Sequence, residues 1–112
     1  MLARNLARGL AELHCVGIVH GDFATENILV KPGSFEVKII DFDIASAEGR
    51  QISAAGNPDF ISQEMTIAIQ KKQKIEAKFQ TDLYALALCC FLVLGDKQRK
   101  FFISLSEDGL DI

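Results

Sequence analysis

Leucines recur about one helical turn apart near the start of the chain, at Leu2, Leu6, Leu10 and Leu13. Charged residues occupy the other faces of the same segment. This spacing predicts an amphipathic helix that ends near Cys15. Gly17 follows as a stop signal for that helix.

Two short apolar segments further along the chain predict a β-hairpin. Residues 28–30 are Ile-Leu-Val, and residues 35–40 alternate apolar side chains with Glu and Lys. The sequence Lys-Pro-Gly-Ser at residues 31–34 separates them and is a turn signal. We therefore expect two antiparallel strands joined by a tight turn.

The rest of the chain divides into a loop, a short helix, a polar segment and a buried helix. Small and polar residues predict a loop over residues 45–57, and residues 60–69 predict a short helix. Residues 70–78 are polar and mostly basic, which indicates a solvated helix face or an insertion. Residues 80–94 are strongly apolar and predict a buried helix, with Gly95 as its stop signal.

Composition indicates a globular, soluble protein of one domain or less. The 112 residues are 49% hydrophobic and 24% charged, and a net charge of −3 gives no indication of nucleic-acid or membrane binding. The longest apolar run, Leu83 to Leu94, is too short to span a bilayer, and the N-terminus lacks the continuous apolar core of a signal peptide. The three cysteines include the adjacent pair Cys89 and Cys90, so we expect reduced thiols in an intracellular, cytoplasmic protein.

Polar residues flank one end of the predicted hairpin. The stretch His20–Val30, HGDFATENILV, spaces His20, Asp22 and Asn27 as H-x-D-x-x-x-x-N just before the first strand. The second strand runs directly into Asp41. Because antiparallel strands return the chain to the same end, we expect Asn27 and Asp41 to lie side by side. Their oxygen atoms suit Mg²⁺, which takes few protein ligands, and Asp22 lies where it could accept or orient a hydroxyl proton.

A simple turn is the alternative interpretation of these residues. Asp and Asn are common in turns, where their side chains bond the local backbone. H-x-D-x-x-x-x-N alone is therefore a weak signal. The same motif followed by a hairpin and by Asp41-Phe42-Asp43 is more specific, and it favours a phosphoryl-transfer site.

Four motifs, taken in order, resemble the eukaryotic protein kinase family. Residues 9–30, GLAELHCVGIVHGDFATENILV, are similar to its helix and catalytic loop, whose pattern is H-R-D-L-x-x-x-N. Residues 37–43, VKIIDFD, are similar to the strand and D-F-G motif that follow. Residues 56–64, GNPDFISQE, resemble the end of an activation segment, and residues 81–95, TDLYALALCCFLVLG, resemble the buried helix after it.

The resemblance implies a partial kinase-like domain over residues 1–112. Its catalytic loop spans residues 20–27, its metal motif residues 41–43, its activation segment residues 41–64 and its buried helix about residues 80–94. The implied fold class is mainly α with a small β-hairpin (α+β), as the incomplete C-terminal lobe of a protein kinase-like fold.

The resemblance also assigns roles to single residues. Asp22 is expected to be the catalytic base, and Asn27 and Asp41 to bind Mg²⁺ beside the ATP phosphates. Leu29 is expected to lie beneath the adenine ring, so Asn27, Leu29 and Asp41 together form the expected cofactor-binding set. His20 and Phe42 are expected to pack the loop. Asp82 is expected to hydrogen-bond the catalytic-loop backbone, or else to match the helix dipole as a simple N-terminal charge.

Several positions depart from the family pattern. Gly21 stands in place of an Arg, Ala24 in place of a Lys, and Asp43 in place of the Gly of D-F-G, while residues 62–64 keep only Glu64 of A-P-E. No Gly-rich loop and no V-A-I-K lysine occur in these 112 residues. We therefore expect an incomplete lobe that is inactive without a nucleotide-binding lobe. We also expect exposed apolar surface on Leu83–Leu94, which calls for a packing partner and lowers the stability of the isolated chain.

The expected function is Mg²⁺·ATP-dependent transfer of a phosphoryl group to a Ser or Thr hydroxyl of an unidentified protein substrate. One alternative is a small-molecule phosphotransferase, similar to aminoglycoside or choline kinases, because HGDF and IDFD suit that group as well. The segment at residues 56–64 favours a protein substrate. A second alternative is a non-catalytic, pseudokinase-like interaction module.

Overall fold

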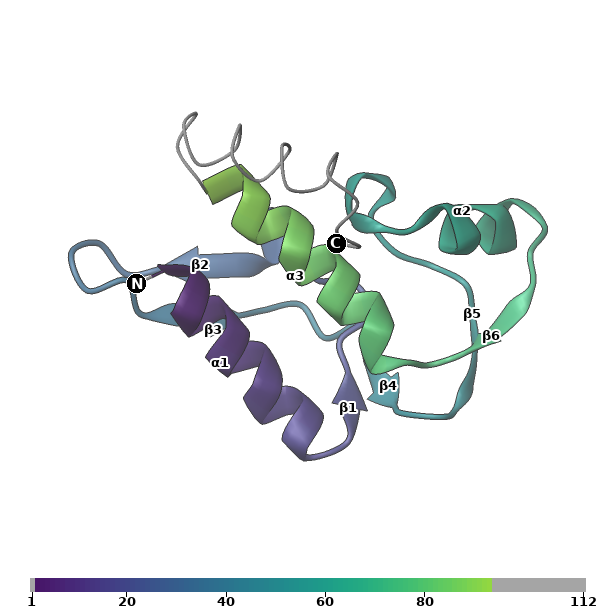
Figure 1. Cartoon of the computed structure of the whole chain (residues 1–112). Coiled ribbons are helices and arrows are strands. Elements are labelled where there is room, and N and C mark those ends of the chain that lie inside the picture. Colours follow the sequence, from purple (N-terminus) through teal and green to yellow (C-terminus); the bar gives the residue numbers. More distant parts are fainter. Residues whose placement is uncertain (1, 94–112) are drawn as a thin grey trace, which may run out of the picture.

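The computed structural model describes residues 2–93, and this part of the chain forms three α-helices and three two-stranded antiparallel sheets (Figure 1). The α-helices are α1 (Leu2–Cys15), α2 (Gln63–Gln70) and α3 (Phe79–Val93). Two short 3₁₀ helices are η1 (Thr25–Asn27) and η2 (Pro58–Phe60). The strands are β1 (Ile18–Val19), β2 (Ile28–Val30), β3 (Val37–Ile39), β4 (Ser46–Ala47), β5 (Gln51–Ser53) and β6 (Lys74–Glu76).

Helix α1 forms over the predicted residues and packs against α3 and β3. Its leucine face supplies Leu6 and Leu10, which are almost fully buried. They join a core that also contains Phe23, Ala24, Phe60, Ala85 and Cys89. Helix α3 contacts both α1 and η2, and its sequence is strongly apolar, which suits a helix with more than one packing partner.

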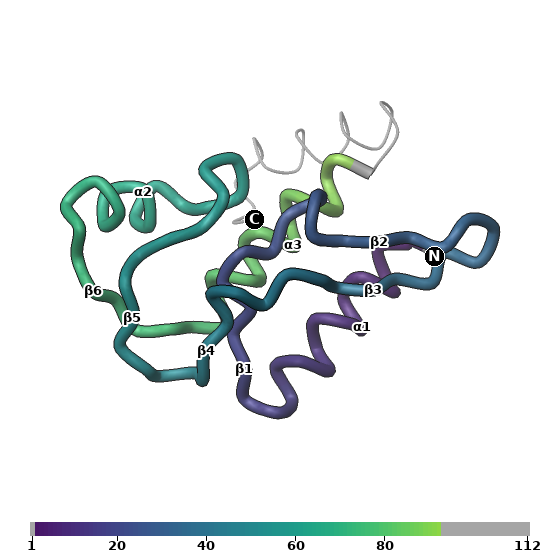
Figure 2. The backbone as a smooth tube through the Cα atoms, turned by 180° about the vertical axis from the view of Figure 1, so that it is seen from behind, coloured from purple at the N-terminus to yellow at the C-terminus, as the bar shows by residue number. Residues whose placement is uncertain are grey.

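The hairpin β2–β3 also forms as predicted, with Ile28 opposite Ile39 and Val30 opposite Val37. Figure 2 shows it lying across the start of α1, and Asn5 Nδ2 donates a 2.7 Å hydrogen bond to Phe35 O at that contact. The second strand begins two residues later than predicted, because Phe35 adopts a left-handed φ of 57° and extends the turn.

Two predictions about the segments beyond the hairpin were wrong. The expected loop at residues 45–57 contains β4 and β5. Residues 70–78, expected to be a solvated helix face or an insertion, contain the strand β6 in place of a helix. Strand β4 pairs with β1, and β5 pairs with β6 so that Ile52 lies opposite Ile75. Strands of two or three residues carry too short an alternation to be recognised before their partners are known.

The second helix begins later than predicted. Residues 60–69 were expected to be helical, but Phe60 belongs to η2 and is buried, and α2 starts at Gln63. Ser62 sets this boundary, since its side-chain oxygen accepts a 3.1 Å hydrogen bond from Met65 N as an N-cap.

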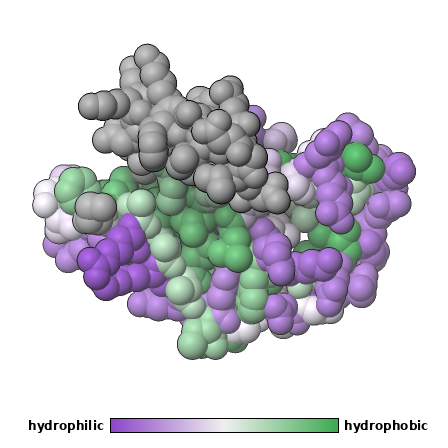
Figure 3. Space-filling model, in the orientation of Figure 1, coloured by the Kyte–Doolittle hydropathy of each residue, from purple (hydrophilic) through white to green (hydrophobic). Residues whose placement is uncertain are grey.

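Helix α3 matches its predicted extent, and its surface is partly apolar. Leu83, Tyr84 and Leu92 are 49%, 45% and 47% exposed, and Figure 3 shows hydrophobic residues gathered over this helix between hydrophilic regions. Leu94 and Gly95, the predicted end and stop signal, lie outside the described residues. The hairpin also exposes apolar side chains, among them Leu29 and Val30. No helix within residues 2–93 is both long and apolar enough to cross a membrane.

Candidate functional site

The backbone of the stretch predicted as a catalytic loop is held by Asp82. This side chain is fully buried in the first turn of α3, where Oδ2 accepts a 2.7 Å hydrogen bond from His20 N and Oδ1 a 2.9 Å bond from Gly21 N. The expected contact is therefore confirmed. The position is also favourable for a carboxylate near a helix N-terminus, so the two interpretations hold together.

His14 is a third donor to Asp82, and this contact was not predicted from the sequence. Its Nε2 lies 2.8 Å from Asp82 Oδ2, and its ring stacks on Phe79 with 4.3 Å between ring centroids. Three donors therefore surround one buried carboxylate, as buried charged groups require. The two residues are 68 positions apart, and no local pattern in the sequence indicates their contact.

His20 is a structural residue, as expected. It is fully buried, its Nε2 lies 2.9 Å from Ile40 O, and its Nδ1 lies 3.1 Å from Asp22 N. A carbonyl oxygen can only accept and an amide can only donate, so His20 is neutral with its proton on Nε2. Its ring packs against Phe42 at 5.1 Å between centroids. His20 thus joins the residue before Asp41 to the loop that carries Asp22.

The hairpin brings the two expected metal ligands to the same end. Ile28 pairs with Ile39 at the end of the ladder. Just beyond this pair, Ile40 N donates a 2.9 Å hydrogen bond to Asn27 O. Asp41 follows immediately along the chain. Asn27 is also tied to Asp22, because its Nδ2 donates a 2.7 Å hydrogen bond to Asp22 O. The structure therefore gathers Asp22, Asn27 and Asp41 around one end of β2–β3.

The atoms that remain available at this end fit a hard cation. The amide nitrogen of Asn27 is engaged, and its Oδ1 accepts no hydrogen bond from residues 2–93, so the free polar atom is an oxygen. Asp41 is exposed, has a left-handed φ of 62°, and its Oδ1 accepts a hydrogen bond from Asp43 N at 3.3 Å. Two oxygen ligands suit Mg²⁺, which keeps waters and takes phosphate oxygens.

No all-protein metal cage exists in the described part of the chain. A group of three His, Cys, Asp or Glu side chains placed to hold a metal ion does not occur in residues 2–93.

The two adjacent cysteines, Cys89 and Cys90, are also unsuited to metal binding. Burial, with a smaller contribution from Cys90, raises the pKa of Cys89 to about 11, and burial raises the pKa of Cys90. Both thiols are therefore protonated at neutral pH, which makes them poor ligands and poor nucleophiles.

Asp22 is positioned through its backbone. Its N–H is bonded to His20 and its carbonyl to Asn27, whereas its half-buried carboxylate accepts no hydrogen bond from residues 2–93. A fixed backbone with free carboxylate oxygens suits a group that accepts or orients a proton.

Leu29 lies on β2, two residues from Asn27, and is 53% exposed. Strand alternation turns Ile28 toward the core and Leu29 to the opposite face. Val30 is also exposed, at 41%. Because Val30 lies on the same face as Ile28, Leu29 alone of the three β2 residues presents an apolar side chain on its face of the hairpin, next to the polar end that carries Asn27 and Asp41.

The packing around Gly21 and Ala24 is consistent with the small residues found at these two departures from the family pattern. Gly21 has a φ of +85°, and a Cβ there would lie 3.2 Å from Ile44 O. Ala24 is fully buried in the core. A side chain at Gly21 would therefore be strained and crowded, and a long basic side chain at Ala24 would have to enter the core. Asp43, at another departure, is exposed, and so is Glu64, the one residue kept from A-P-E.

A side-chain contact links the loop to the segment that ends at residue 64. Asn57 Nδ2 donates to Glu26 Oε1, and Asn57 Oδ1 accepts a 2.9 Å hydrogen bond from Asp59 N as the cap of η2. Neither Glu26 nor Asn57 was predicted to be a site residue. An Asn before Pro is a recognisable turn signal, but its partner 31 residues away is not.

Comparisons with known proteins agree with the motif order. The family model of the protein kinase domain matches residues 1–103. Serine/threonine-protein kinase GL21140 of Drosophila persimilis is 28% identical over 107 residues, which cover 89% of this chain and 14% of that protein. Serine/threonine-protein kinase CG17528 of Drosophila melanogaster is 29% identical over 107 residues, with the same coverage. Misshapen-like kinase 1 of Rattus norvegicus is 28% identical over 91 residues, which cover 78% of this chain and 7% of that protein. The chain thus spans 14% or less of the length of these relatives.

Proposed function

The chain belongs to the protein kinase family, and we propose that it carries the catalytic-loop and metal-binding half of a site that phosphorylates a Ser or Thr hydroxyl of a protein. The observation that supports this proposal is the convergence of three residues at one end of the hairpin. Asn27 O accepts from Ile40 N, and Asn27 Nδ2 donates to Asp22 O, so Asp22, Asn27 and Asp41 share one local framework.

Each of the three residues has a distinct proposed role. Asp22 accepts or orients the proton of the attacking hydroxyl, because its carboxylate oxygens are free while its backbone is held on both sides. Asn27 holds Mg²⁺ through Oδ1, and Asp41 holds it through its exposed carboxylate, of which only Oδ1 accepts a hydrogen bond from residues 2–93. The ion, when bound with ATP, offsets the negative charge of the phosphates.

Leu29 is proposed to support the adenine ring. Its 53% exposed side chain lies on the strand that begins at Asn27, so an apolar surface adjoins the polar phosphate end. A nucleotide needs both features side by side, since its base is flat and apolar while its phosphates are charged.

A protein substrate is favoured over a small molecule by the family match and by two of the named relatives, which are serine/threonine-protein kinases. The contact of Asn57 with Glu26 adds support. It ties the end of the segment at residues 41–64, the proposed activation segment, to the proposed catalytic loop at residues 20–27.

We also propose that residues 1–112 alone do not turn over ATP. Neither a Gly-rich loop nor a V-A-I-K lysine occurs in this sequence, and Ala24 leaves no room for the basic residue that would steady the transferred phosphate. Binding of metal and nucleotide is therefore a more direct readout of the site than catalysis.

The test uses Mn²⁺ as a paramagnetic substitute for Mg²⁺. Mn²⁺·ATP is titrated into the ¹⁵N-labelled chain, and amide signals near Asn27 and Asp41 are expected to broaden first. The variant Asp41→Ala should abolish this local broadening. Asp43→Ala is the matched control, because it removes an exposed carboxylate two residues from Asp41. It keeps the backbone N–H of residue 43, which donates a hydrogen bond to Asp41 Oδ1. Broadening that Asp41→Ala leaves unchanged would contradict the metal assignment.

A further inference from the structure

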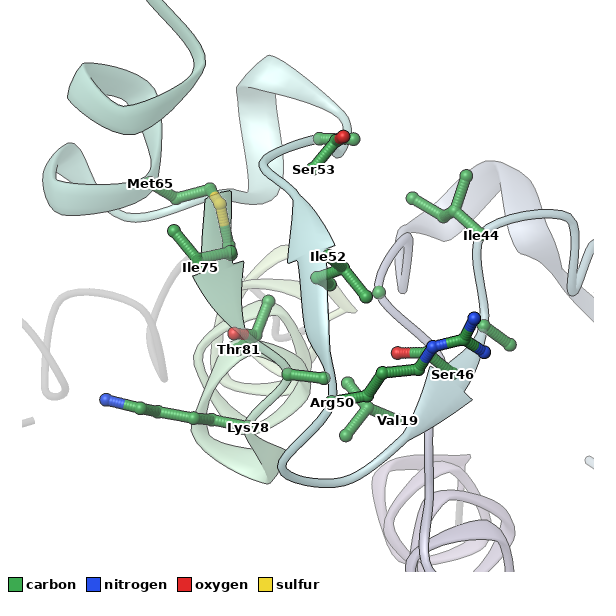
Figure 4. A pocket seen from close by; sticks show the side chains of 14 residues that line it. Val19, Ile44, Ser46, Arg50, Ile52, Ser53, Met65, Ile75, Lys78 and Thr81 are labelled. Carbon is green, nitrogen blue, oxygen red and sulfur yellow. The ribbon is translucent and has the colours of Figure 1, made fainter. Parts of the chain in front are cut away.

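A cavity of about 290 Å³ lies among β4, β5, β6 and the start of α3 (Figure 4). None of Asp22, Asn27 and Asp41 lines it. Its walls are mostly aliphatic, and their larger side chains are Val19, Ile44, Ile52, Met65 and Ile75. Small-molecule sites typically combine such apolar walls with a few polar groups that fix orientation.

The first polar group in this cavity is the hydroxyl of Ser46. Within residues 2–93, Ser46 Oγ is the one buried side-chain polar atom that has no hydrogen-bond partner. Figure 4 shows the hydroxyl on β4 pointing toward the space beside β5. Buried polar atoms in folded proteins almost always have a partner, so this hydroxyl indicates a polar group of an occupant.

The second polar group is the guanidinium of Arg50, just before β5. Figure 4 shows its side chain extending toward β4 and Ser46, whereas the ammonium group of Lys78 points away from the other labelled side chains. Arg50 forms no ion pair with any residue in the described range, and none of the lining residues is acidic. One uncompensated positive charge therefore lies beside the unpartnered hydroxyl.

We propose that this cavity binds an amphipathic monocarboxylate, with its carboxylate between Arg50 and Ser46 and its tail against the aliphatic walls. A guanidinium presents paired N–H donors that match a carboxylate, and the hydroxyl of Ser46 supplies a further donor. A single available cation matches a single negative charge. A phosphate dianion would need a second cation; Lys78 also lines the cavity, but its ammonium group points away from the other labelled side chains.

The test uses octanoate as the probe and octanol as its neutral analogue with the same chain length. Each is titrated into the full chain, and amide shifts are recorded by NMR. Octanoate is expected to shift signals of Ser46, Ile52 and Ile75 and to bind about threefold to fivefold more tightly than octanol, as befits a partly exposed ion pair. This comparison uses the unaltered protein, and it reads binding alone, independently of phosphoryl transfer.

Two charge-matched variants locate the carboxylate. Arg50→Gln is expected to weaken octanoate binding about threefold to fivefold and to remove the preference over octanol. Lys78→Gln removes the same charge from an exposed residue that points away, and it should leave octanoate binding unchanged. The proposal is overturned if both variants weaken binding equally, if octanoate shifts the hairpin signals of Leu29 and Val30 instead, or if it does not bind, which would mean that only water fills the cavity.

Discussion

His14 Nε2 lies 2.8 Å from Asp82 Oδ2, which joins the last turn of α1 to the first turn of α3. The same carboxylate accepts backbone hydrogen bonds from His20 and Gly21. Because Asp82 is fully buried, these donors replace the water that its charge loses on folding. The backbone of His20 and Gly21, just before Asp22, is therefore fixed by the Asp82 side chain, which is 62 and 61 positions further along the chain. Asp82 in turn is held by His14 of α1.

The first prediction concerns this carboxylate. Asp82→Asn replaces one carboxylate oxygen by an NH₂ group, which would face the N–H donors of His14, His20 or Gly21. It also removes the negative charge to which these groups donate. We expect the free energy of unfolding to fall by about 3 kcal/mol. Urea unfolding followed by circular dichroism measures this change.

Asp59→Asn is the matched control for Asp82→Asn, because Asp59 is exposed and its change should stay within about 0.5 kcal/mol. A double-mutant cycle with His14→Ala should show a coupling of about 0.5–3 kcal/mol between His14 and Asp82. Equal effects of Asp82→Asn and Asp59→Asn would mean that the buried network does not hold the loop.

Features set by local pattern were predictable from the sequence. The leucine repeat of α1, the alternation and turn signal of β2–β3, and the apolar run of α3 each predicted the observed element. The hairpin also brought Asn27 and Asp41 to one end, since antiparallel pairing leaves no other arrangement. The contact of Asp82 with the loop was predicted from the family resemblance, not from periodicity.

Features set by distant pairing were not predictable. Strands β5 and β6 exist because Ile52 and Ile75 pair across more than twenty residues, and neither segment alternates long enough alone. The contacts of His14 with Asp82 and of Asn57 with Glu26 likewise join segments that only the folded chain brings together. In each case the missing information is tertiary, and local propensity cannot supply it.

The second prediction is that restoring the Arg of the family pattern at Gly21 destabilises the fold. Gly21→Arg places a side chain at a φ of +85° and a Cβ 3.2 Å from Ile44 O. Gly33→Arg is the control, because Gly33 has a φ of +87° but open space around its Cβ. The φ strain should cost each variant about 1–2 kcal/mol. Crowding should cost Gly21→Arg about 1–3 kcal/mol more, measured by urea unfolding, and an equal loss in both would exclude the steric argument.

The third prediction concerns pH. Burial raises the pKa of Cys89 from 9.0 to about 11 in the folded protein, so the unfolded chain loses this proton at lower pH. The free energy of unfolding should therefore fall as pH rises from about 9 to about 11. Denaturant titrations across this range should show a shallower decline for Cys89→Ala. Cys15→Ala, which alters an exposed thiol, should keep the decline of the unaltered protein. Identical declines in all three proteins would rule out Cys89 as the titrating group.

The last prediction concerns Ala24, where the family pattern places a Lys. Ala24 is fully buried among Leu10, Phe23 and other core side chains, so Ala24→Lys forces an ammonium into the core or displaces its neighbours. We expect a loss of about 3–5 kcal/mol in the free energy of unfolding, against about 0.5 kcal/mol for Thr25→Lys at the exposed neighbouring position. If Ala24→Lys were as stable as Thr25→Lys, its side chain would have a path to solvent near Asp22, and the proposal that this position leaves no room for a phosphate-steadying cation would fail.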